Sequence, residues 1–368
     1  MEANEAALLR ECMALARRGS GAVEPNPIVG ALVVKDGEIV GKGFHASFGG
    51  PHAEIAALRE AGARAAGADL YVSLEPCCTH GKTPPCTEAI IAARLRRVVF
   101  GAVDPNPRHA GRAQAILARA GIEAIGPALD PDCRDLIAPF ARYVRGRRPF
   151  VLAKWAQTLD GKIATSTGES QWITGLAARA RSHEERARAD GIMVGINTVL
   201  RDDPALTVRH VEGKNPHRFV VDTELKMPLL AKLLNDGAAP VTIFASEAAA
   251  MARGSKYSAR GAKVATAPLG PDGRIDLGQM MEWLRTNGIH RLMVEGGPRL
   301  IGSMLSKRLI DRVMTFTAPK LLGDAQALSA LAGEAAPTLA DAQTLADASI
   351  EQVGPDWLVT GRLEKDVY

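Results

Sequence analysis

The 368 residues contain few aromatic side chains, which make up 4% of the total, and no long run of charges of one sign. Proteins that follow a nucleic-acid strand use a basic groove with interleaved aromatic side chains. The formal net charge of +4 is mild. The composition therefore argues against a nucleic-acid partner and suits a phosphorylated small molecule.

Long hydrophobic runs are missing too. No apolar stretch approaches the ~20 residues that a membrane-spanning helix needs. Residues 5–18 follow Met1 with apolar groups at helical spacing, and not with the apolar core of a secretory signal. We therefore expect no membrane partner and a cytoplasmic location.

Cysteine is scarce and odd in number, which argues against a disulfide framework. Three of the five cysteines, Cys77, Cys78 and Cys86, fall in one cluster, whereas Cys12 and Cys133 are isolated. We expect the isolated pair to be packing residues. The cluster requires a different explanation.

The cluster supplies the residues of a three-ligand zinc site. His52-Ala53-Glu54 precedes Cys77 and Cys86. Structural zinc normally has four protein ligands, whereas one histidine and two thiolates leave a position for water. Glu54 falls in the first turn of a predicted helix, where it can carry protons between that water and a substrate. The pattern predicts a hydrolytic site in which Glu54 is a proton shuttle and not a ligand.

The second thiolate is open to alternatives. Zinc base deaminases carry P-C-x-x-C, but here eight residues separate Cys77 from Cys86, so Cys78 and His80 are rival ligands. We favour Cys86 because Pro84-Pro85 can begin a helix whose first turn presents it. The alternative that the three cysteines are buried packing residues remains.

The length indicates two domains, which we place at residues 1–147 and 148–368 on either side of the Arg-rich stretch at 145–149. Strands alternate with helices in both parts, which predicts a three-layer α/β fold for the first and an α/β fold for the second. In the first part we expect helices at 5–18, from 52, at 85–95, 110–120 and 130–145, and strands at 28–34, 38–44, 70–74, 97–103 and near 122. In the second part we expect helices at 177–189 and 299–307, and strands at 150–153, 192–194, 219–221, 241–244, 291–294 and 313–318.

The turn Glu295-Gly296-Gly297-Pro298 lies between a predicted strand and a predicted helix. Such a turn aims backbone N–H groups at an anion, so it is a candidate phosphate site. No G-x-G-x-x-G follows an early strand in this half, so a dinucleotide would bind outside that fingerprint.

The ordered motifs of the chain resemble the bifunctional pyrimidine deaminase/reductase family of riboflavin biosynthesis over nearly the whole length. The resemblance implies a cytidine-deaminase-like N-terminal domain and a dihydrofolate-reductase-like C-terminal domain. The deaminase half is matched by residues 25–30, 52–54, 74–77, 80–86 and 104–107, and the reductase half by residues 159–162, 168–174, 198–209, 294–298 and 318–323.

The resemblance implies two consecutive steps, with one Zn²⁺ per chain and NADPH as cofactors. First, 2,5-diamino-6-(5-phosphoribosylamino)pyrimidin-4(3H)-one loses its 2-amino group as ammonia. NADPH then reduces the ribosyl group to a ribityl chain, which gives 5-amino-6-(5-phosphoribitylamino)uracil. The resemblance also favours His52, Cys77 and Cys86 as the ligands, and we expect a homo-oligomer.

The resemblance further implies the site residues. Glu54 is the catalytic residue of deamination, and Lys154 and Asp160 are candidates without an assigned step. Glu24 and His109 depart from the family pattern. The expected substrate contacts are Asn26, His45, Lys82, Asn106, Ser170, Arg186, Leu206, Arg209 and Glu295, and the expected cofactor contacts are Ala156, Trp172, Thr198, Asp202, Thr223, Gly296, Gly297 and Pro298.

Two other functions fit part of the sequence. A nucleoside or tRNA deaminase fused to an unrelated α/β domain would carry the same zinc motif, although the low aromatic content disfavours it. The second alternative function is a binding module that uses zinc only for stability. The intact Glu54 argues against it.

Overall fold

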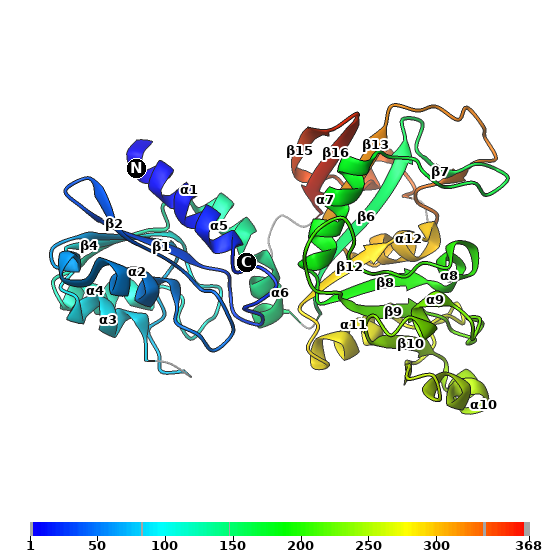
Figure 1. The fold of residues 1–368 in the computed structure, drawn as a ribbon, viewed down its shortest axis with the longest axis horizontal. Helices are drawn as coiled ribbons and strands as arrows, with labels where there is room; N and C mark the ends of the chain where they lie inside the picture. The colour runs from blue at the N-terminus through cyan, green and yellow to red at the C-terminus, as the bar shows by residue number, and fades with distance from the viewer. Residues whose placement is uncertain (1–2, 82–83, 147, 334–335, 364–368) are drawn as a thin grey trace. The chain divides into compact units, whose positions relative to one another are not determined.

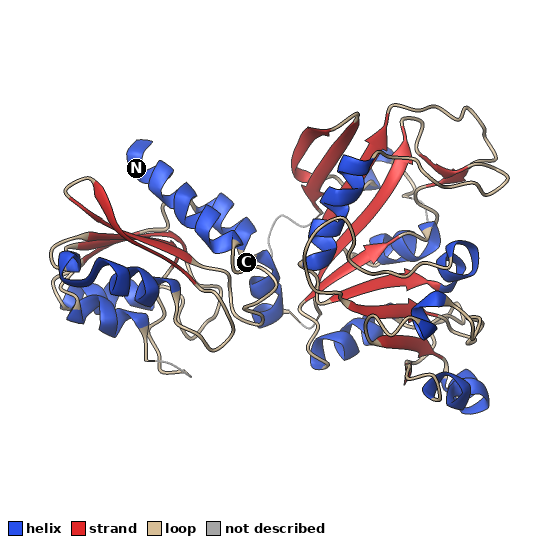
Figure 2. Cartoon of the chain, viewed as in Figure 1, coloured by secondary structure: helices blue, strands red, loops and turns tan. Residues whose placement is uncertain are grey.

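The computed structural model describes residues 3–81, 84–146, 148–333 and 336–363, and it divides the chain into two compact units that change over at Gly146. Helices and strands alternate along both units (Figures 1 and 2). Among the described residues, no helix has the length and apolar character needed to cross a membrane.

The first unit is a five-stranded sheet in the order β2-β1-β3-β4-β5. Strand β1 is antiparallel to β2 and β3, and β3, β4 and β5 are parallel. Its elements are α1 (Ala3–Arg17), β1 (Gly30–Lys35), β2 (Glu38–Phe44), α2 (Ala53–Ala61), β3 (Asp69–Leu74), α3 (Cys86–Ala92), β4 (Arg97–Ala102), α4 (Arg112–Arg119), β5 (Glu123–Ile125), α5 (Asp130–Leu136) and α6 (Ala138–Arg145).

The central strands β1, β3 and β4 are buried on both faces, because alternate side chains enter two different cores. In β1, Ala31 and Val33 join the core that contains Ala57 of α2, whereas Leu32 packs with Leu9 of α1 on the opposite face. Helices α2, α3 and α4 lie on one side and α1 and α5 on the other (Figure 1). The three-layer arrangement predicted from the sequence is confirmed.

The second unit contains a nine-stranded sheet in the order β11-β10-β9-β8-β12-β6-β13-β16-β15, of which the first seven strands are parallel, and a small sheet of β7 and β14. Its strands are β6 (Phe150–Thr158), β7 (Lys162–Ala164), β8 (Gly191–Gly195), β9 (His217–Val221), β10 (Val241–Ala245), β11 (Lys263–Thr266), β12 (Arg291–Glu295), β13 (Arg312–Ala318), β14 (Leu328–Ser329), β15 (Ala346–Val353) and β16 (Asp356–Arg362). Its helices are α7 (Leu176–Ala187), α8 (Ile196–Asp202), α9 (Lys232–Asn235), α10 (Glu247–Ser258), α11 (Leu277–Thr286) and α12 (Pro298–Ser306).

Helices cover both faces of this sheet as well. Met280 of α11 and Met304 of α12 pack with Met193 of β8 on one face. Ile192 of the same strand joins Tyr257 of α10 on the opposite face. Because the parallel strands all point the same way, the loops after β6, β8, β9 and β12 gather at one edge of the sheet, where α/β proteins bind ligands.

The predicted helix over residues 130–145 is wrong in one respect, since the structure has two helices, α5 and α6. Ile137 joins them with φ −105° and ψ 14°, and Pro139 lies in the first turn of α6. Proline has no backbone N–H to continue a helix from the preceding turn, but it is well tolerated in a first turn. The strand expected near residue 122 begins at Glu123, and β6 continues to Thr158, well beyond the predicted 150–153.

Candidate active sites

Three side chains from separate elements converge in the first unit. His52 is the N-cap residue of α2, Cys77 follows β3, and Cys86 begins α3. The Nδ1 atom of His52 lies 3.2 Å from Sγ of Cys86 and 3.5 Å from Sγ of Cys77. The ligand atoms of the three residues all lie within 4.8 Å of one another.

This arrangement fits zinc. Bonds of about 2.1 Å to nitrogen and about 2.3 Å to sulfur in a tetrahedron put neighbouring ligand atoms roughly 3.5–3.8 Å apart. The two distances from Nδ1 of His52 are close to that spacing. Cys77 can supply a thiolate, because hydrogen bonds from Cys86 and His52 lower its pKa below that of an ordinary thiol. A backbone N–H, that of Cys86, also donates to Cys77 Sγ at 3.3 Å.

The rival ligands face other partners. Sγ of Cys78 lies 3.7 Å from Nδ1 of His109. His80 is exposed and pairs with Glu88 at 3.1 Å. Neither belongs to the group of three potential ligands found among the described residues. The structure therefore brings together the set that the sequence favoured, with Cys86 as its second thiol.

Glu54 lies in the first turn of α2, and 4% of it is exposed. Burial, together with the charge of Cys77, raises the pKa of Glu54 to about 7, and its side chain also contacts Cys86. The carboxyl therefore lies beside the three potential ligands, on the helix that begins immediately after His52. This is the position that a proton shuttle requires.

Two of the expected substrate contacts of this unit meet. Nδ1 of His45 lies 2.9 Å from the carbonyl oxygen of Pro51, and Nε2 lies 3.1 Å from Nδ2 of Asn26. If Nδ1–H donates to the carbonyl, Nε2 accepts from the amide, and the imidazole is neutral. Burial lowers the pKa of His45, which agrees with that state. The His45 ring also contacts the His52 ring edge to face, with centroids 5.3 Å apart.

Asn106 lies in a turn that a buried carboxylate holds in place. Glu75 accepts hydrogen bonds from the backbone N–H groups of Asp104, Gly111 and Ala113, at 3.2, 2.9 and 3.0 Å. Asp104 in turn accepts from the N–H of Asn106 at 2.8 Å. The predicted contact Lys82 lies outside the described residues.

The two departures from the family pattern have local partners. The Glu24 carboxylate accepts hydrogen bonds from the N–H groups of Gly21 and Val23, both at 3.1 Å, so it closes its own turn. The His109 ring lies 3.4 Å from the backbone nitrogen of Cys78 and 3.5 Å from the hydroxyl of Thr79. His109 therefore links two loops at the edge of the site.

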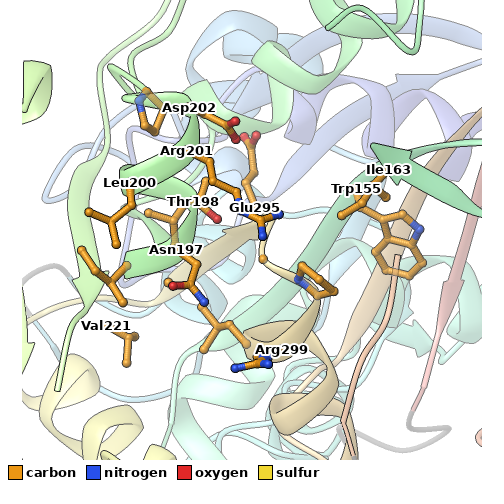
Figure 3. A pocket seen from close by; sticks show the side chains of 18 of the residues that line it. Trp155, Ile163, Asn197, Thr198, Leu200, Arg201, Asp202, Val221, Glu295 and Arg299 are labelled. Carbon is orange, nitrogen blue, oxygen red and sulfur yellow. The ribbon is translucent and has the colours of Figure 1, made fainter. Parts of the chain in front are cut away.

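The second unit contains a cavity of ≈ 1520 Å³ at the carboxyl edge of its parallel strands. Thr198 and Glu295 lie among the side chains around it (Figure 3). Gly296 and Gly297, with φ 69° and 70°, form the turn that leads into α12. All the substrate and cofactor contacts expected in this half line the cavity: Ala156, Ser170, Trp172, Arg186, Thr198, Asp202, Leu206, Arg209, Thr223, Glu295, Gly296, Gly297 and Pro298.

A buried ion pair forms one wall of this cavity. Arg186 of α7 binds Glu295 at the end of β12 through Nε and Nη2, at 3.0, 2.8 and 2.9 Å. Lys154 of β6 lies 3.7 Å from the same carboxylate. Although burial opposes ionisation, the charges of Arg186 and Lys154 lower the pKa of Glu295 to about 2. Burial also lowers the pKa of Lys154.

Helix α7 positions the loop that carries Leu206 and Arg209. Nη1 of Arg186 donates to the carbonyl oxygen of Thr207 at 2.5 Å, and the backbone N–H of Arg209 donates to Nδ1 of His183 at 2.8 Å. Sequence reasoning missed His183, and it also missed Arg179, which lines the cavity. The signal was present, because positions 179, 183 and 186 share one face of a helix.

Asp160 holds two loops beside the cavity. Its carboxylate accepts a hydrogen bond from the Thr158 hydroxyl at 2.6 Å and from the N–H groups of Leu322 and Gly323, at 3.1 and 2.8 Å. These contacts lower the pKa of Asp160 to about 2. Nearby, Nζ of Lys320 donates to the carbonyl oxygen of Trp172 at 2.8 Å.

Two family models match separate parts of the chain. Residues 2–102 match the cytidine and deoxycytidylate deaminase zinc-binding region, and residues 149–359 match the RibD C-terminal domain. The riboflavin biosynthesis protein RibD of Aquifex aeolicus is 43% identical over 86% of this chain and 87% of its own. RibD of Bacillus amyloliquefaciens is 41% identical over 96% of both chains.

A solved structure agrees over both units. The diaminohydroxyphosphoribosylaminopyrimidine deaminase/5-amino-6-(5-phosphoribosylamino)uracil reductase of Thermotoga maritima is 35% identical, with a TM-score of 0.82 over 97% of this chain and 98% of that chain. The chain therefore belongs to the RibD family of bifunctional deaminase/reductase enzymes of riboflavin biosynthesis, which use zinc and NADPH.

Proposed function

We propose that this chain deaminates 2,5-diamino-6-(5-phosphoribosylamino)pyrimidin-4(3H)-one through residues 1–147 and reduces the ribosyl group of the product through residues 148–368. The substrate class comes from the Thermotoga maritima relative, which is similar over nearly the whole chain. One observation carries the proposal: the same chain holds the group His52, Cys77 and Cys86 beside buried Glu54 and a separate cavity that all thirteen expected reductase contacts line.

In the first step, His52, Cys77 and Cys86 would hold a zinc ion, which when bound would supply an activated water molecule next to the ring carbon that bears the 2-amino group. A carboxylate oxygen of Glu54 takes a proton from that water and returns one to the departing ammonia, so a single carboxyl serves both directions. Asn26, His45, Lys82 and Asn106 bind the base and its ribose phosphate.

The neutral ring of His45 supports this assignment. With Nδ1–H donating to Pro51, the amide of Asn26 donates to Nε2 and keeps its own carbonyl oxygen for the substrate. Two adjacent groups are thereby held in one orientation before the substrate arrives, which lowers the entropy lost on binding.

In the second step, Ala156, Trp172, Thr198, Asp202, Thr223 and the turn Gly296-Gly297-Pro298 hold NADPH, which supplies the hydride. When bound, the cofactor would supply the hydride to the carbon of the C=N bond in the ring-opened sugar imine, and water would supply the proton to its nitrogen. Ser170, Arg186, Leu206, Arg209 and Glu295 bind and orient that substrate. Glu295 keeps its negative charge because it pairs with Arg186, so it accepts hydrogen bonds and does not donate them.

We also propose that the protein works in the cytoplasm as a homo-oligomer. Thiol ligands need a reducing compartment, and all five cysteines are free. The last strand of the large sheet, β15, exposes Ile350, which is 73% exposed. An exposed apolar residue on an edge strand favours pairing with a second copy. Light scattering during size-exclusion chromatography would test this, and a monomer at micromolar concentration would contradict it.

The two activities are tested together on purified protein. We expect release of ammonia from the diaminopyrimidine substrate, followed by oxidation of NADPH that depends on the deaminated product. The alternative, a nucleoside or tRNA deaminase fused to an unrelated domain, predicts deamination of nucleosides or RNA and no oxidation of NADPH. That result would contradict the proposed function.

A further inference from the structure

We propose that Glu75 is a positioning residue for the deamination step. Its buried carboxylate fixes the turn that carries Asn106 relative to the strand end that carries Cys77. The proposal rests on the proposed function in one respect, which is that Asn106 binds the deamination substrate. It rests otherwise on hydrogen bonds within the first unit.

The main chain at Glu75 belongs to the central sheet. Glu75 follows β3 directly, two residues before Cys77, and it is 2% exposed. Its backbone N–H donates to the carbonyl oxygen of Ala102 at 2.8 Å, which continues the pairing of β3 with β4. The sheet therefore holds both Glu75 and the approach to Cys77 in place.

The side chain of Glu75 reaches a different segment. Within the described part of the chain, its carboxylate accepts from three backbone N–H groups: Oε2 from Asp104 at 3.2 Å and Gly111 at 2.9 Å, and Oε1 from Ala113 at 3.0 Å. Gly111 is the N-cap residue of α4, and Ala113 lies in its first turn, where N–H groups have no partner within the helix. One carboxylate thus fixes both ends of residues 104–113.

These partners explain why a carboxylate is buried here. Burying a carboxylate is costly unless hydrogen bonds satisfy it. N–H groups at the start of a helix suit it, since the helix dipole favours negative charge there. An amide at position 75 would turn an NH₂ group toward at least one of these N–H groups, so that donors would face donors. Glutamine therefore cannot replace Glu75 without disturbing the turn.

The fixed turn orients the side chain of Asn106. The backbone N–H of Asn106 donates to Oδ1 of Asp104 at 2.8 Å, and Oδ1 of Asn106 accepts the N–H of Arg108 at 3.1 Å. No hydrogen bond within the described residues occupies Nδ2 of Asn106, so this group is left to donate to an oxygen or ring nitrogen of the substrate. Its direction is set before the substrate binds, which lowers the entropy lost on binding.

The same two segments meet again at His109, where the chain departs from the family pattern. Nδ1 of His109 lies 3.4 Å from the backbone nitrogen of Cys78 and 3.5 Å from the hydroxyl of Thr79. These contacts join the turn to the chain directly after Cys77. They are longer than the hydrogen bonds of Glu75, so His109 is the weaker of the two links.

The test compares the kinetics of deamination in wild type, Glu75→Gln and Glu75→Asp. We expect Glu75→Gln to raise the KM of the diaminopyrimidine substrate roughly 5- to 30-fold, because one well-oriented hydrogen bond is lost. The kcat should stay within about threefold, since Glu54 belongs to α2 and not to the turn. Glu75→Asp keeps the charge with a shorter reach, so its KM should lie between the other two. It is also the second variant to use if Glu75→Gln does not fold.

A double-mutant cycle with Asn106→Ala separates positioning from a general loss of structure. If Glu75 acts through Asn106, Glu75→Gln should change the KM by less than about twofold once Asn106 is alanine. Zinc content and the absorption of Co²⁺ bound in place of zinc should match wild type in Glu75→Gln, because the sheet still holds the strand end at Cys77.

Asp69→Asn is the matched control. Asp69 is a buried carboxylate at the other end of β3, and it pairs with Arg96 and Arg97 at 2.7 and 2.9 Å. Its replacement should lower the melting temperature of the first unit by a few degrees, as Glu75→Gln also should, but it should leave the KM unchanged. An equal rise of the KM in both variants would show a general loosening of the sheet and would overturn the proposal.

Three further results would overturn it. Loss of zinc from Glu75→Gln would show that the carboxylate supports the metal site. Effects that multiply in the double mutant would show that Glu75 does not act through Asn106, and an unchanged KM in Glu75→Gln would show no role. Wild-type protein that releases no ammonia would instead contradict the proposed function, so the two failures are distinguishable.

Discussion

At the scale of the residue, charge pairing decides what buried polar groups can do in the reductase cavity. Glu295 is held as an anion because Arg186 and Lys154 surround it, and burial alone would have favoured the neutral acid. His183 is held neutral, with a pKa of about 3, because burial and the charge of Arg186 disfavour the imidazolium. A neutral ring is what allows Nδ1 to accept the N–H of Arg209.

The depressed pKa of His183 predicts a pH-dependent stability. At a pH between 6.5, the ordinary pKa of histidine, and about 3, the pKa of His183 in the folded protein, His183 binds a proton in the unfolded chain but not in the folded chain. The contribution of His183 is therefore fully present above pH 6.5 and is lost as the pH falls toward 3. The charged and titratable groups that face this ring are Arg186, Glu295, Arg209 and His210.

The measurement compares melting temperatures of wild type and His183→Asn between pH 7.5 and pH 4. Asparagine can also accept from the N–H of Arg209 but does not titrate. We expect the advantage of the wild type, of a few degrees at neutral pH, to shrink or reverse as the pH falls. A constant difference across this range would contradict a neutral, buried His183.

Glu54 gives a second prediction at this scale. Glu54→Gln keeps the shape of the side chain and removes its ability to carry a proton. The rate of deamination should therefore fall by roughly 10²- to 10⁴-fold. Zinc content and the reduction of supplied deaminated product should be unchanged. Glu60→Gln, at an exposed position of the same helix α2, is the control. Loss of zinc from Glu54→Gln would identify the carboxylate as a ligand.

At the scale of the element, the sites are built where element ends meet, and this explains how far the sequence could predict them. His52 and Cys77 fit a short motif with strong ligand chemistry, and the family resemblance favoured Cys86 over its rivals, so the meeting of the three could be expected from the sequence. The contacts between α7 and residues 206–209 could not be predicted from the sequence. Arg186 meets Thr207, and His183 meets Arg209, only after the sheet has formed. Their shared helical face was the available signal.

Elements without an alternating pattern were missed for a physical reason. Strand β15 is exposed at nearly every position, so it lacks the polar and apolar alternation that predicts a half-buried strand. Helix α10 exposes most of its side chains, and Gly254 and Tyr257 are its buried residues. Strands β8, β9, β10 and β12 were predicted, because burial on both faces requires a continuous apolar run.

The hydrogen bonds of the Asp160 carboxylate lead to a prediction about the loop at residues 320–323. Asp160→Asn removes the charge that accepts hydrogen bonds from Leu322 and Gly323, so residues 320–323 should loosen, and with them the contact from Lys320 to Trp172. We expect the KM of NADPH to rise by roughly 3- to 10-fold, because charged hydrogen bonds are replaced by weaker ones. Limited proteolysis should cut this loop faster.

Asp341→Asn is the matched control for Asp160→Asn, because Asp341 contacts Thr338 in an exposed turn away from the cavity lining. The control should leave both the KM of NADPH and the proteolysis rate unchanged. Faster cleavage without any change in the KM would show that the hydrogen bonds of Asp160 support the fold and do not shape the cofactor site.

At the scale of the whole molecule, each compact unit has its own sheet, its own core and its own site. The core that contains Ala53 and Ala57 includes the first turn of α2, next to His52, whereas the cores around Met193 and Ile192 support the cavity. Because no core residue is shared between the clusters, disturbance of one site should leave the other intact.

Removal of zinc tests this independence. A chelator should abolish ammonia release, because His52, Cys77 and Cys86 then hold no ion, and it should lower the unfolding temperature of the first unit, because metal binding stabilises the folded state. The reductase reaction with supplied deaminated substrate should keep its rate within about twofold, and added zinc should restore ammonia release. Parallel loss of both activities on chelation would show that the two units depend on one another, and it would contradict the separation inferred from their cores.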